Sequence, residues 1–427
     1  MARAGAPRRV LGWGGFPRPP PMLELLFADP APWKLASIPL TAAVIGWFTN
    51  WIAIRMTFHP LRFLGIPPWL GWQGIIPRKA EKMARIFVDS SMRRLGSVPE
   101  LFEGMEPEVI ARHIEQVLAP RLRHYTDDVM IASKGETWER APRDLRERVY
   151  GAVARELPRL VRDVLADFGE HLEDLLDFRH MVVRRLVEDR SLLNRLFLEA
   201  GAREFRFLID SGFYFGFLFG VVQLATWVIA PGRWQLPAYG LVVGWATNWL
   251  ALNLVFRPLQ PVRVGPWRLQ GLFLKRQKEV AAVWCRIVTR EILTVRRFMA
   301  SMITGPHGEL ARATIFRHLR PVVDEALAAA GPLARSAIAP GDLERITRSF
   351  ERKALEVTAD PLEDERFNDD RAAVVERMLR ERIEEMPPEE FQELLRPCFK
   401  EDEWILIALG AVLGLLAGLA QIWFVFD

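Results

Sequence analysis

Residues 46–53 of this 427-residue chain read GWFTNWIA, and residues 244–251 read GWATNWLA. The likeness continues as far as Leu61 and Leu259, so that nine of sixteen positions are identical at an offset of 198 residues. Ordinary amino-acid composition gives roughly one identity in a comparison of this length. The two stretches therefore predict an internal duplication, which decides how the whole chain is organised.

The same offset returns much further along the chain. Glycine and glutamine recur at one spacing in two apolar segments, as Gly212, Gly216, Gly220 and Gln223 and again as Gly410, Gly414, Gly418 and Gln421. Between these points the offset shifts by one residue, because Gln73-Gly74 corresponds to Gln270-Gly271. Chance does not hold one offset at both ends of a unit, so we expect two halves of equal length.

Four stretches are apolar and long enough to cross a bilayer core, which takes about 20 helical residues. They cover residues 35–58, 211–230, 236–256 and 404–426. The alternative is a set of buried helices in a soluble protein. These stretches are apolar on all faces and carry tryptophan or charge at their ends, which favours membrane helices.

Two long polar segments, residues 59–210 and 257–402, lie between these stretches. Their apolar residues recur at helical spacing, with proline breaks and little strand signal. Each segment is predicted to form a helical soluble domain whose apolar stripes pack against neighbouring helices. The predicted fold is an all-α membrane protein with four transmembrane helices in two tandem repeats, each repeat carrying one such domain.

Only residues 231–235 join the second and third apolar stretches, so both polar segments must lie on the same side of the membrane. Eleven lysines and arginines lie near the membrane ends on that side, against three on the other. Cytoplasmic loops carry such an excess, so the soluble domains are expected in the cytoplasm. Because the two halves share one orientation, their symmetry axis should run along the membrane normal.

Residues 1–34 are predicted to be an N-terminal tail. Glycines and prolines interrupt the tail, so it lacks the continuous apolar core of a cleaved signal peptide. Met22 is an alternative start of translation, because the proline-rich stretch before it has no evident structural role. The sequence leaves the choice between Met1 and Met22 open.

Composition and motifs argue against several classes of function. The net charge is +4, and 57 basic residues are interspersed with 53 acidic ones, so the chain has no basic face for nucleic acid. Cys285 and Cys398 fit neither a disulfide framework nor a metal site. The seven histidines form no metalloprotease motif, and no phosphate-binding loop or nucleophile elbow is present. We expect no catalytic residues, no metal and no cofactor.

Two threonine–asparagine pairs, Thr49-Asn50 and Thr247-Asn248, place polar groups at membrane depth. An unpaired polar group there is costly, so both pairs should face protein rather than lipid. One interpretation is that the asparagines hydrogen-bond to each other's half across an interface between the repeats. The other is a polar site for an ion or a substrate headgroup at that interface.

The six glycines lie four residues apart, on one face of each helix. Small residues at this spacing let helix backbones approach closely, so Gly212, Gly216 and Gly220, and their counterparts Gly410, Gly414 and Gly418, are predicted to be packing residues. One turn further on, Gln223 and Gln421 are expected to supply an interhelical hydrogen bond.

Basic pairs follow the first and third apolar stretches, as Arg78-Lys79 and Lys275-Arg276. They could bind phospholipid headgroups, or they could simply anchor the topology, since long basic side chains reach toward headgroups from helix ends. The sequence does not decide between these two interpretations.

At these repeats the chain resembles a bacterial membrane-protein family catalogued as domain of unknown function 445. The resemblance rests on residues 45–61 (IGWFTNWIAIRMTFHPL), 73–79 (QGIIPRK), 205–223 (FRFLIDSGFYFGFLFGVVQ) and 399–421 (FKEDEWILIALGAVLGLLAGLAQ), and it spans roughly residues 35–425. It implies a multi-pass protein of the bacterial cell (inner) membrane, and it supplies no catalytic residues.

The leading hypothesis is a non-enzymatic membrane scaffold or lipid-interacting protein, whose partners are the lipid bilayer and a protein not identified by the sequence. The alternative is a small transporter or channel with a polar site at the interface between the repeats. Four helices make a small transporter, so that alternative would require a homo-oligomer.

Overall fold

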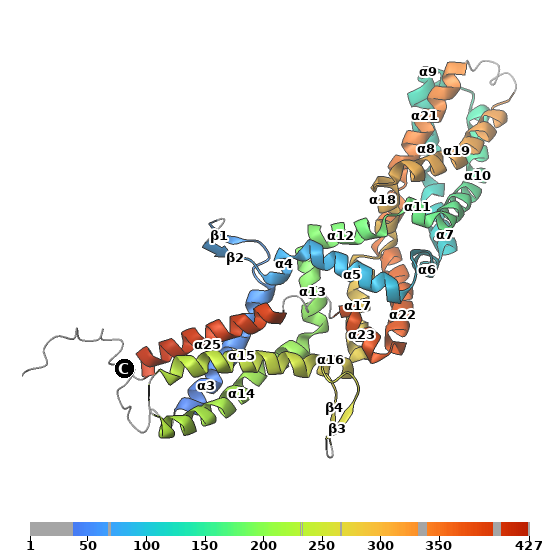
Figure 1. Ribbon diagram of the computed structural model, residues 1–427. Coiled ribbons are helices and arrows are strands. Elements are labelled where there is room, and N and C mark those ends of the chain that lie inside the picture. Colours follow the sequence, from blue (N-terminus) through green and yellow to red (C-terminus); the bar gives the residue numbers. More distant parts are fainter. Residues whose placement is uncertain are drawn as a thin grey trace, which may run out of the picture. The chain divides into compact units, whose positions relative to one another are not determined.

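The computed structural model describes residues 37–66, 70–230, 232, 234–264, 267–331, 340–395 and 403–425. The described chain is almost all helical (Figure 1). It divides into two compact units. The apolar unit comprises Met1–Ile54, Phe207–Ala251 and Trp404–Asp427, and the polar unit comprises Arg55–Arg206 and Leu252–Glu403.

Four long helices supply the apolar unit: α3 (Ile38–Phe58), α14 (Ala202–Ile229), α15 (Gln235–Phe256) and α25 (Glu403–Val425). Among the described residues, three helical stretches are long and apolar enough to cross a membrane, namely Ala202–Ile229, Gln235–Val255 and Glu403–Trp423. Helix α3 has 21 residues but is not one of them, because Thr49, Asn50 and Arg55 lower its hydropathy. The structure thus gives three candidate spans where the sequence predicted four.

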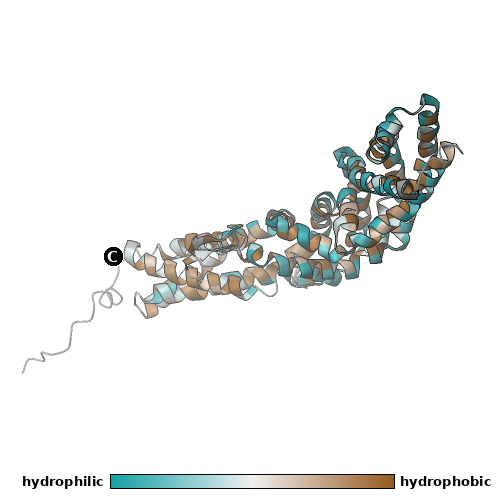
Figure 2. Cartoon of the chain, turned by 90° about the horizontal axis from the view of Figure 1, so that it is seen from above, coloured by the Kyte–Doolittle hydropathy of each residue, from teal (hydrophilic) through white to brown (hydrophobic). Residues whose placement is uncertain are grey.

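The outer surface of the apolar unit carries large apolar side chains. Phe48, Leu218, Trp245 and Leu416, one from each of the four helices, are all more than a third exposed. Figure 2 colours the helices next to the labelled C-terminus mostly brown, whereas the helices of the polar unit alternate between brown and teal. A soluble protein seldom exposes so much contiguous apolar surface, and a membrane would cover it.

The start of one long helix differs by several residues from the predicted one. Helix α14 begins at Ala202, nine residues before the predicted start at 211, because the helix continues through the charged residues Arg203, Glu204 and Arg206. Hydropathy marks only the part of a helix that avoids water, and therefore misses a polar extension. Residues 35 and 36, predicted to open the first helix, lie outside the described residues.

The first half of the polar unit is a series of helices after one hairpin. Its elements are β1 (Leu64–Ile66), β2 (Leu70–Trp72), α4 (Ile75–Arg78), α5 (Ala80–Leu95), α6 (Val98–Gly104), α7 (Pro107–Leu118), η1 (Ala119–Arg121), α8 (Leu122–Lys134), α9 (Glu136–Glu139), α10 (Arg143–Glu170), α11 (Leu172–Leu175), α12 (Phe178–Glu188) and α13 (Arg190–Ala200).

The second half has the same order with fewer breaks. Its elements are β3 (Val262–Val264), β4 (Trp267–Leu269), α16 (Leu272–Lys275), α17 (Gln277–Glu291), α18 (Val295–Thr304), α19 (Gly308–Ala329), α21 (Pro340–Val357), η2 (Asp360–Glu363), α22 (Glu365–Glu385) and α23 (Pro388–Leu395).

Helix starts in the polar unit follow local capping chemistry. The Ser97 hydroxyl accepts a hydrogen bond from the Glu100 N–H at the start of α6, and Thr294 does the same for the Arg297 N–H at the start of α18. A side-chain oxygen at this position satisfies one of the N–H groups that a helix start leaves without a partner. Ser97 and Thr294 lie 197 residues apart, which is the offset that Gln73 and Gln270 show.

The two antiparallel hairpins, β1–β2 and β3–β4, were not expected in an all-α fold. Each strand has only three residues, too few for an alternating pattern to be read from the sequence. In the first hairpin Gly65 pairs with Gly71 and has φ +138°, a conformation that side chains disfavour.

The two polar segments form one compact unit rather than two separate soluble domains. Helix α10 of the first half packs along α19 of the second, α13 packs on α17, and α23 packs on α5. One core cluster joins Val129 of α8 to Leu319 and Val323 of α19 and to Ile346 of α21. The apolar stripes predict that each helix has a partner, but they do not say in which half the partner lies.

Candidate functional site

Two pairs of helices in the apolar unit cross in close contact at glycines. Gly216 of α14 lies so close to α3 that a Cβ there would be 2.5 Å from the Ala42 carbonyl oxygen, and a Cβ on Gly220 would be 2.6 Å from the Pro39 Cα. Gly414 meets the Gly240 carbonyl and Gly418 the Leu236 carbonyl in the same way, between α25 and α15. Residues at an offset of 198 thus lie in equivalent positions in the two helix pairs.

The asparagines lie beside the first glycine of each series. Asn50 Nδ2 donates to the Leu208 carbonyl at 2.8 Å, and Asn248 Nδ2 donates to the Leu406 carbonyl, also at 2.8 Å. A Cβ on Gly212 would be 2.7 Å from the Asn50 Nδ2, so the absence of a side chain there opens the path to the helix backbone. Each asparagine therefore joins two helices of its own half.

This arrangement differs from the predicted contact between the repeats. The side-chain hydroxyls of Thr49 and Thr247 donate to the carbonyls of Gly46 and Gly244, within their own helices. Both threonines and both asparagines are buried. The sequence does not show which backbone carbonyl a buried amide will bond. In the structure each accepting carbonyl, that of Leu208 or Leu406, is left accessible by the glycine that follows it four residues later.

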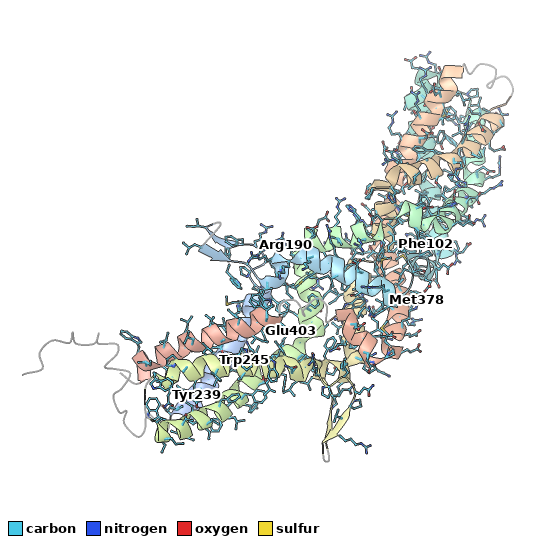
Figure 3. The ribbon with its side chains drawn as sticks, viewed as in Figure 1. Phe102, Arg190, Tyr239, Trp245, Met378 and Glu403 are labelled. Carbon is cyan, nitrogen blue, oxygen red and sulfur yellow. The ribbon has the colours of Figure 1, made fainter. Side chains whose placement is uncertain are left out.

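The two halves meet instead at a small cavity in the apolar unit. The cavity has a volume of about 20 Å³ and is lined by residues of all four helices, including Thr49, Gln223, Tyr239 and Gln421. Figure 3 labels Tyr239 on α15. The Nε2 atoms of Gln223 and Gln421 are buried and have no hydrogen-bond partner among the described residues. The structure thus brings Thr49 and both glutamines together, but not Asn50, Thr247 or Asn248.

The size and chemistry of this cavity limit what it can hold. A cavity needs roughly 10–15 Å³ to hold one water molecule, so this one has room for a single water. Two amide donors and a threonine hydroxyl are suitable partners for that water. The lining contains no acidic or basic side chain, and no group of histidine, cysteine or acidic residues in the described parts of the chain could hold a metal.

Each hairpin of the polar unit is hydrogen-bonded to the chain that leaves the preceding long helix. Trp72 Nε1 donates to the Met56 carbonyl at 3.0 Å, in the last turn of α3, and Gln73 Nε2 donates to the Leu61 carbonyl at 2.9 Å. In the second half Gln270 Nε2 donates to the Leu259 carbonyl at 3.2 Å. These bonds fix the base of each hairpin.

Apolar side chains on the first hairpin face outward. Leu64, Ile66 and Leu70 are 65%, 73% and 75% exposed, and Val262 of the second hairpin is about half exposed. Three such side chains on a fixed hairpin form a surface that water solvates poorly. The basic residues beyond this loop stand out in the sequence, but the hairpin itself does not.

The four basic residues have different surroundings. Arg78 and Lys275 are exposed at the ends of α4 and α16. Arg276 Nη1 donates to both carboxylate oxygens of Glu204, at 2.7 and 2.9 Å, and Arg276 Nε donates to Glu279. Burial disfavours the charged form of Arg276, but its hydrogen bonds to Glu204 and Glu279 outweigh burial and raise its pKa. Lys79 is half-buried and has an interaction partner.

One pair of contacts in the polar unit was missed entirely. Arg195 of α13 forms an ion pair with Glu291 of α17 at 3.1 Å. At the positions that correspond to these by the repeat offset, Glu393 of α23 pairs with Arg94 of α5. The two ion pairs occupy equivalent positions with their charges exchanged, and an identity count between the halves scores this as two mismatches.

Comparison with known proteins finds relatives among bacterial membrane proteins. A "UPF0754 membrane protein" of Shouchella clausii is 42% identical over 62 residues, which is 14% of this chain and 16% of the relative. A protein of the same name from Thermosynechococcus vestitus is 35% identical over 96 residues, 21% of each chain. Another, from Rippkaea orientalis, is 26% identical over 175 residues, covering 40% of this chain and 39% of the relative.

These matches cover between 16% and 39% of the relatives' own length. No protein-family model matches the chain, so the numbered family that the sequence resembles is not confirmed, and no solved structure matches either. The names of the relatives state a membrane location and no activity. The chain is therefore similar to bacterial membrane proteins whose names state no activity, in agreement with its three candidate membrane-spanning helices.

Proposed function

We propose that this chain is a non-enzymatic, multi-pass membrane protein whose polar unit contacts the lipid surface through its two hairpins. The observation that carries the proposal is the first hairpin, where Leu64, Ile66 and Leu70 are exposed although their strands are bonded to the end of α3. A helix that leaves a bilayer delivers the next few residues to the interface. Apolar side chains held there would bury their surface among the lipids.

The proposal includes α3 as a fourth membrane-spanning helix. Thr49 bonds within its own helix through its hydroxyl, and Asn50 bonds the Leu208 carbonyl through its amide nitrogen. Such bonding lowers the cost of placing polar groups in hydrocarbon. Helix α15 carries the same Thr-Asn pair and is itself a candidate span.

The proposal also takes the two halves as tandem repeats with their polar segments on the cytoplasmic side. The recurrence of the asparagine, glycine and hairpin contacts at one offset supports the duplication. The excess of arginine and lysine on the side of the polar unit supports the orientation. Exposed Arg78 and Lys275 would then lie close enough to the membrane to contact anionic headgroups.

Depth-dependent quenching tests the lipid contact. Full-length protein lacking its own cysteines (Cys285→Ala, Cys398→Ser) would carry a fluorophore at Ile66→Cys and be reconstituted in nanodiscs of phosphatidylethanolamine and phosphatidylglycerol. Lipids that carry a nitroxide near the headgroup should quench this fluorophore strongly. The matched control is Leu310→Cys on α19, because Leu310 is also an exposed apolar residue but lies far along the chain from any apolar helix.

Equal quenching at Ile66→Cys and Leu310→Cys would remove the lipid contact from the proposal. Strong quenching at Ile66→Cys that disappears when Leu64 and Leu70 are both replaced by serine would support it. The serine variant also shows whether the hairpin enters the lipid through its apolar side chains or only lies close to the membrane.

A transporter or channel, assembled as a homo-oligomer, is the second candidate, favoured by the two buried amides that face one cavity between the halves. The present volume of about 20 Å³ admits no solute, so transport would need the cavity to open. Gln223→Leu with Gln421→Leu separates the two functions. If the cavity conducts ions, the double variant should abolish ion flux in liposomes. If the protein is a scaffold, the double variant should be at least as stable to unfolding as the natural protein.

A further inference from the structure

A large apolar cavity lies inside the polar unit, between helices of both halves. Its volume is about 150 Å³, and its walls come from α7, α8, α10, α18, α19 and α21. Leu157 and Val161 of α10, Leu319 of α19 and Phe350 of α21 are among its lining residues. The apolar side chains around a space of this size have fewer packing contacts than those of a filled core.

Water is a poor occupant of this cavity. Its lining contains few polar groups, and two of them are already bonded, since the Thr126 hydroxyl donates to the Leu122 carbonyl and the Thr358 hydroxyl to the Ala354 carbonyl. A buried water needs two to four polar partners, and an apolar cavity of about 150 Å³ stays dry and takes up hydrocarbon instead. The chemistry of the walls therefore points to an apolar occupant.

One edge of the cavity has a polar character that the rest lacks. Lys353 of α21 and Tyr125 of α8 both line it, and the Lys353 ammonium lies 5.4 Å from the centre of the Tyr125 ring. Lys353 Nζ is 2.8 Å from Asp128 and 3.5 Å from Glu356, while the Tyr125 hydroxyl donates to Asp360. An ammonium has three N–H donors, so Lys353 can keep both acidic partners and still donate to one further oxygen.

We propose that this cavity binds the acyl chain of a lipid or a fatty acid, with the chain among the apolar walls and its carbonyl oxygen at Lys353. The arrangement has the form of a small-molecule site, a concave apolar body with a few polar groups that set the orientation of the ligand. The hairpins contribute none of the lining residues, so this site does not depend on the lipid contact of the proposed function.

The length of the chain that fits is set by Phe350. A second cavity of about 170 Å³ is lined by Trp138, Val149, Val323 and Ile346, and Phe350 lines both cavities. Phe350 is the lining residue that the two cavities share. Replacing Phe350 with alanine should join the two spaces and allow a longer acyl chain to enter.

Photo-crosslinking tests the site in the whole protein. Full-length protein in nanodiscs would be irradiated with one of two probes, a fatty acid or a phosphatidylcholine that carries a diazirine in its acyl chain. Peptide mapping should place crosslinks on α8, α10 and α21. The fatty-acid arm and the phospholipid arm identify which source supplies the chain, and a crosslink in either arm at these helices supports the site.

Two variants that fill the cavity, one on α21 and one on α10, test whether the crosslinks arise from this site. Ala354→Trp on α21 and Val164→Phe on α10 should each reduce the mapped crosslinks at least fivefold, while Leu343→Trp, at an exposed position of α21, should leave them unchanged. If one filling variant fails to fold, the other still tests the site. Crosslinks confined to the apolar unit, or crosslinks on α8, α10 and α21 that both folded filling variants leave unchanged, would overturn the proposal.

Discussion

Contacts recur at equivalent positions of the two halves in both units, but the recurring residues differ between the apolar and the polar unit. In the apolar unit the same residue types recur, so that Asn50 and Asn248 reach the carbonyls of Leu208 and Leu406 at the same distance. In the polar unit the positions recur but the charges are exchanged, as in Arg195 with Glu291 and Arg94 with Glu393. A water-exposed ion pair needs only opposite charges, in either order, and contributes little.

The difference teaches what each environment demands. In hydrocarbon a polar side chain needs one particular acceptor, and the close helix approach that exposes this acceptor needs a glycine. Neither requirement can be met by a residue of another type. Single substitutions at the repeated contacts should therefore destabilise the apolar unit more than the polar unit.

The largest effect is expected at the glycine crossings. Gly212→Val and Gly410→Val should each destabilise the protein by about 3 kcal/mol, because the new side chain meets the asparagine amide and pushes the helices apart. Unfolding by sodium dodecyl sulfate in mixed micelles measures the loss. Phe217→Val, at an exposed position of α14, is the control and should change stability by less than about 1 kcal/mol.

A loss at only one of the two glycines would show that the halves are not equivalent in packing. A loss of the same size at Phe217→Val would show that the whole helix surface, rather than the crossing, is sensitive.

A smaller effect is expected at the asparagines. Asn50→Leu and Asn248→Leu each remove one interhelical hydrogen bond, and such bonds contribute on the order of 1 kcal/mol in membranes. The same unfolding assay should give equal losses for the two variants. A much larger loss for Asn50→Leu would point to a second role for the Asn50 Oδ1, which is buried and has no partner among the described residues.

The smallest effect is expected at the ion pair of α5 and α23. Arg94→Glu should cost less than about 1 kcal/mol at low salt, and adding Glu393→Arg should restore stability, since the double variant reproduces the charge order of Arg195 and Glu291. Repeating the measurement in about 1 M salt should remove the difference between the variants. Failure of the double reversal to restore stability would mean that the pair depends on more than opposite charge.

Part of the arrangement could be predicted from the sequence, and the parts that could not be predicted have physical reasons. The repeat in residues 46–61 and 244–259 located equivalent positions, and the glycines of α14 and α25 lie at helix crossings. The partners of Asn50 and Asn248 could not be predicted, because any backbone carbonyl can accept an amide. The hairpins were missed because their three-residue strands are shorter than any periodic pattern.

The joining of the two polar segments was not predictable for a related reason. An apolar stripe such as that of α10 specifies that something must cover it, but α19 and a helix of its own half would cover it equally well. The cavity beside α10 could not be predicted from the sequence either, since it depends on how completely six helices fill the space between them.

The packing of first-half helices on second-half helices has a consequence for how the chain folds during synthesis. Helix α5 is packed by α23, and their ion pair joins residues 299 positions apart. At about 5–20 residues per second a ribosome takes roughly 15–60 s to make that length of chain. During this interval the newly made α5 has no partner on that face, so the nascent first half must be shielded from aggregation until translation supplies α23.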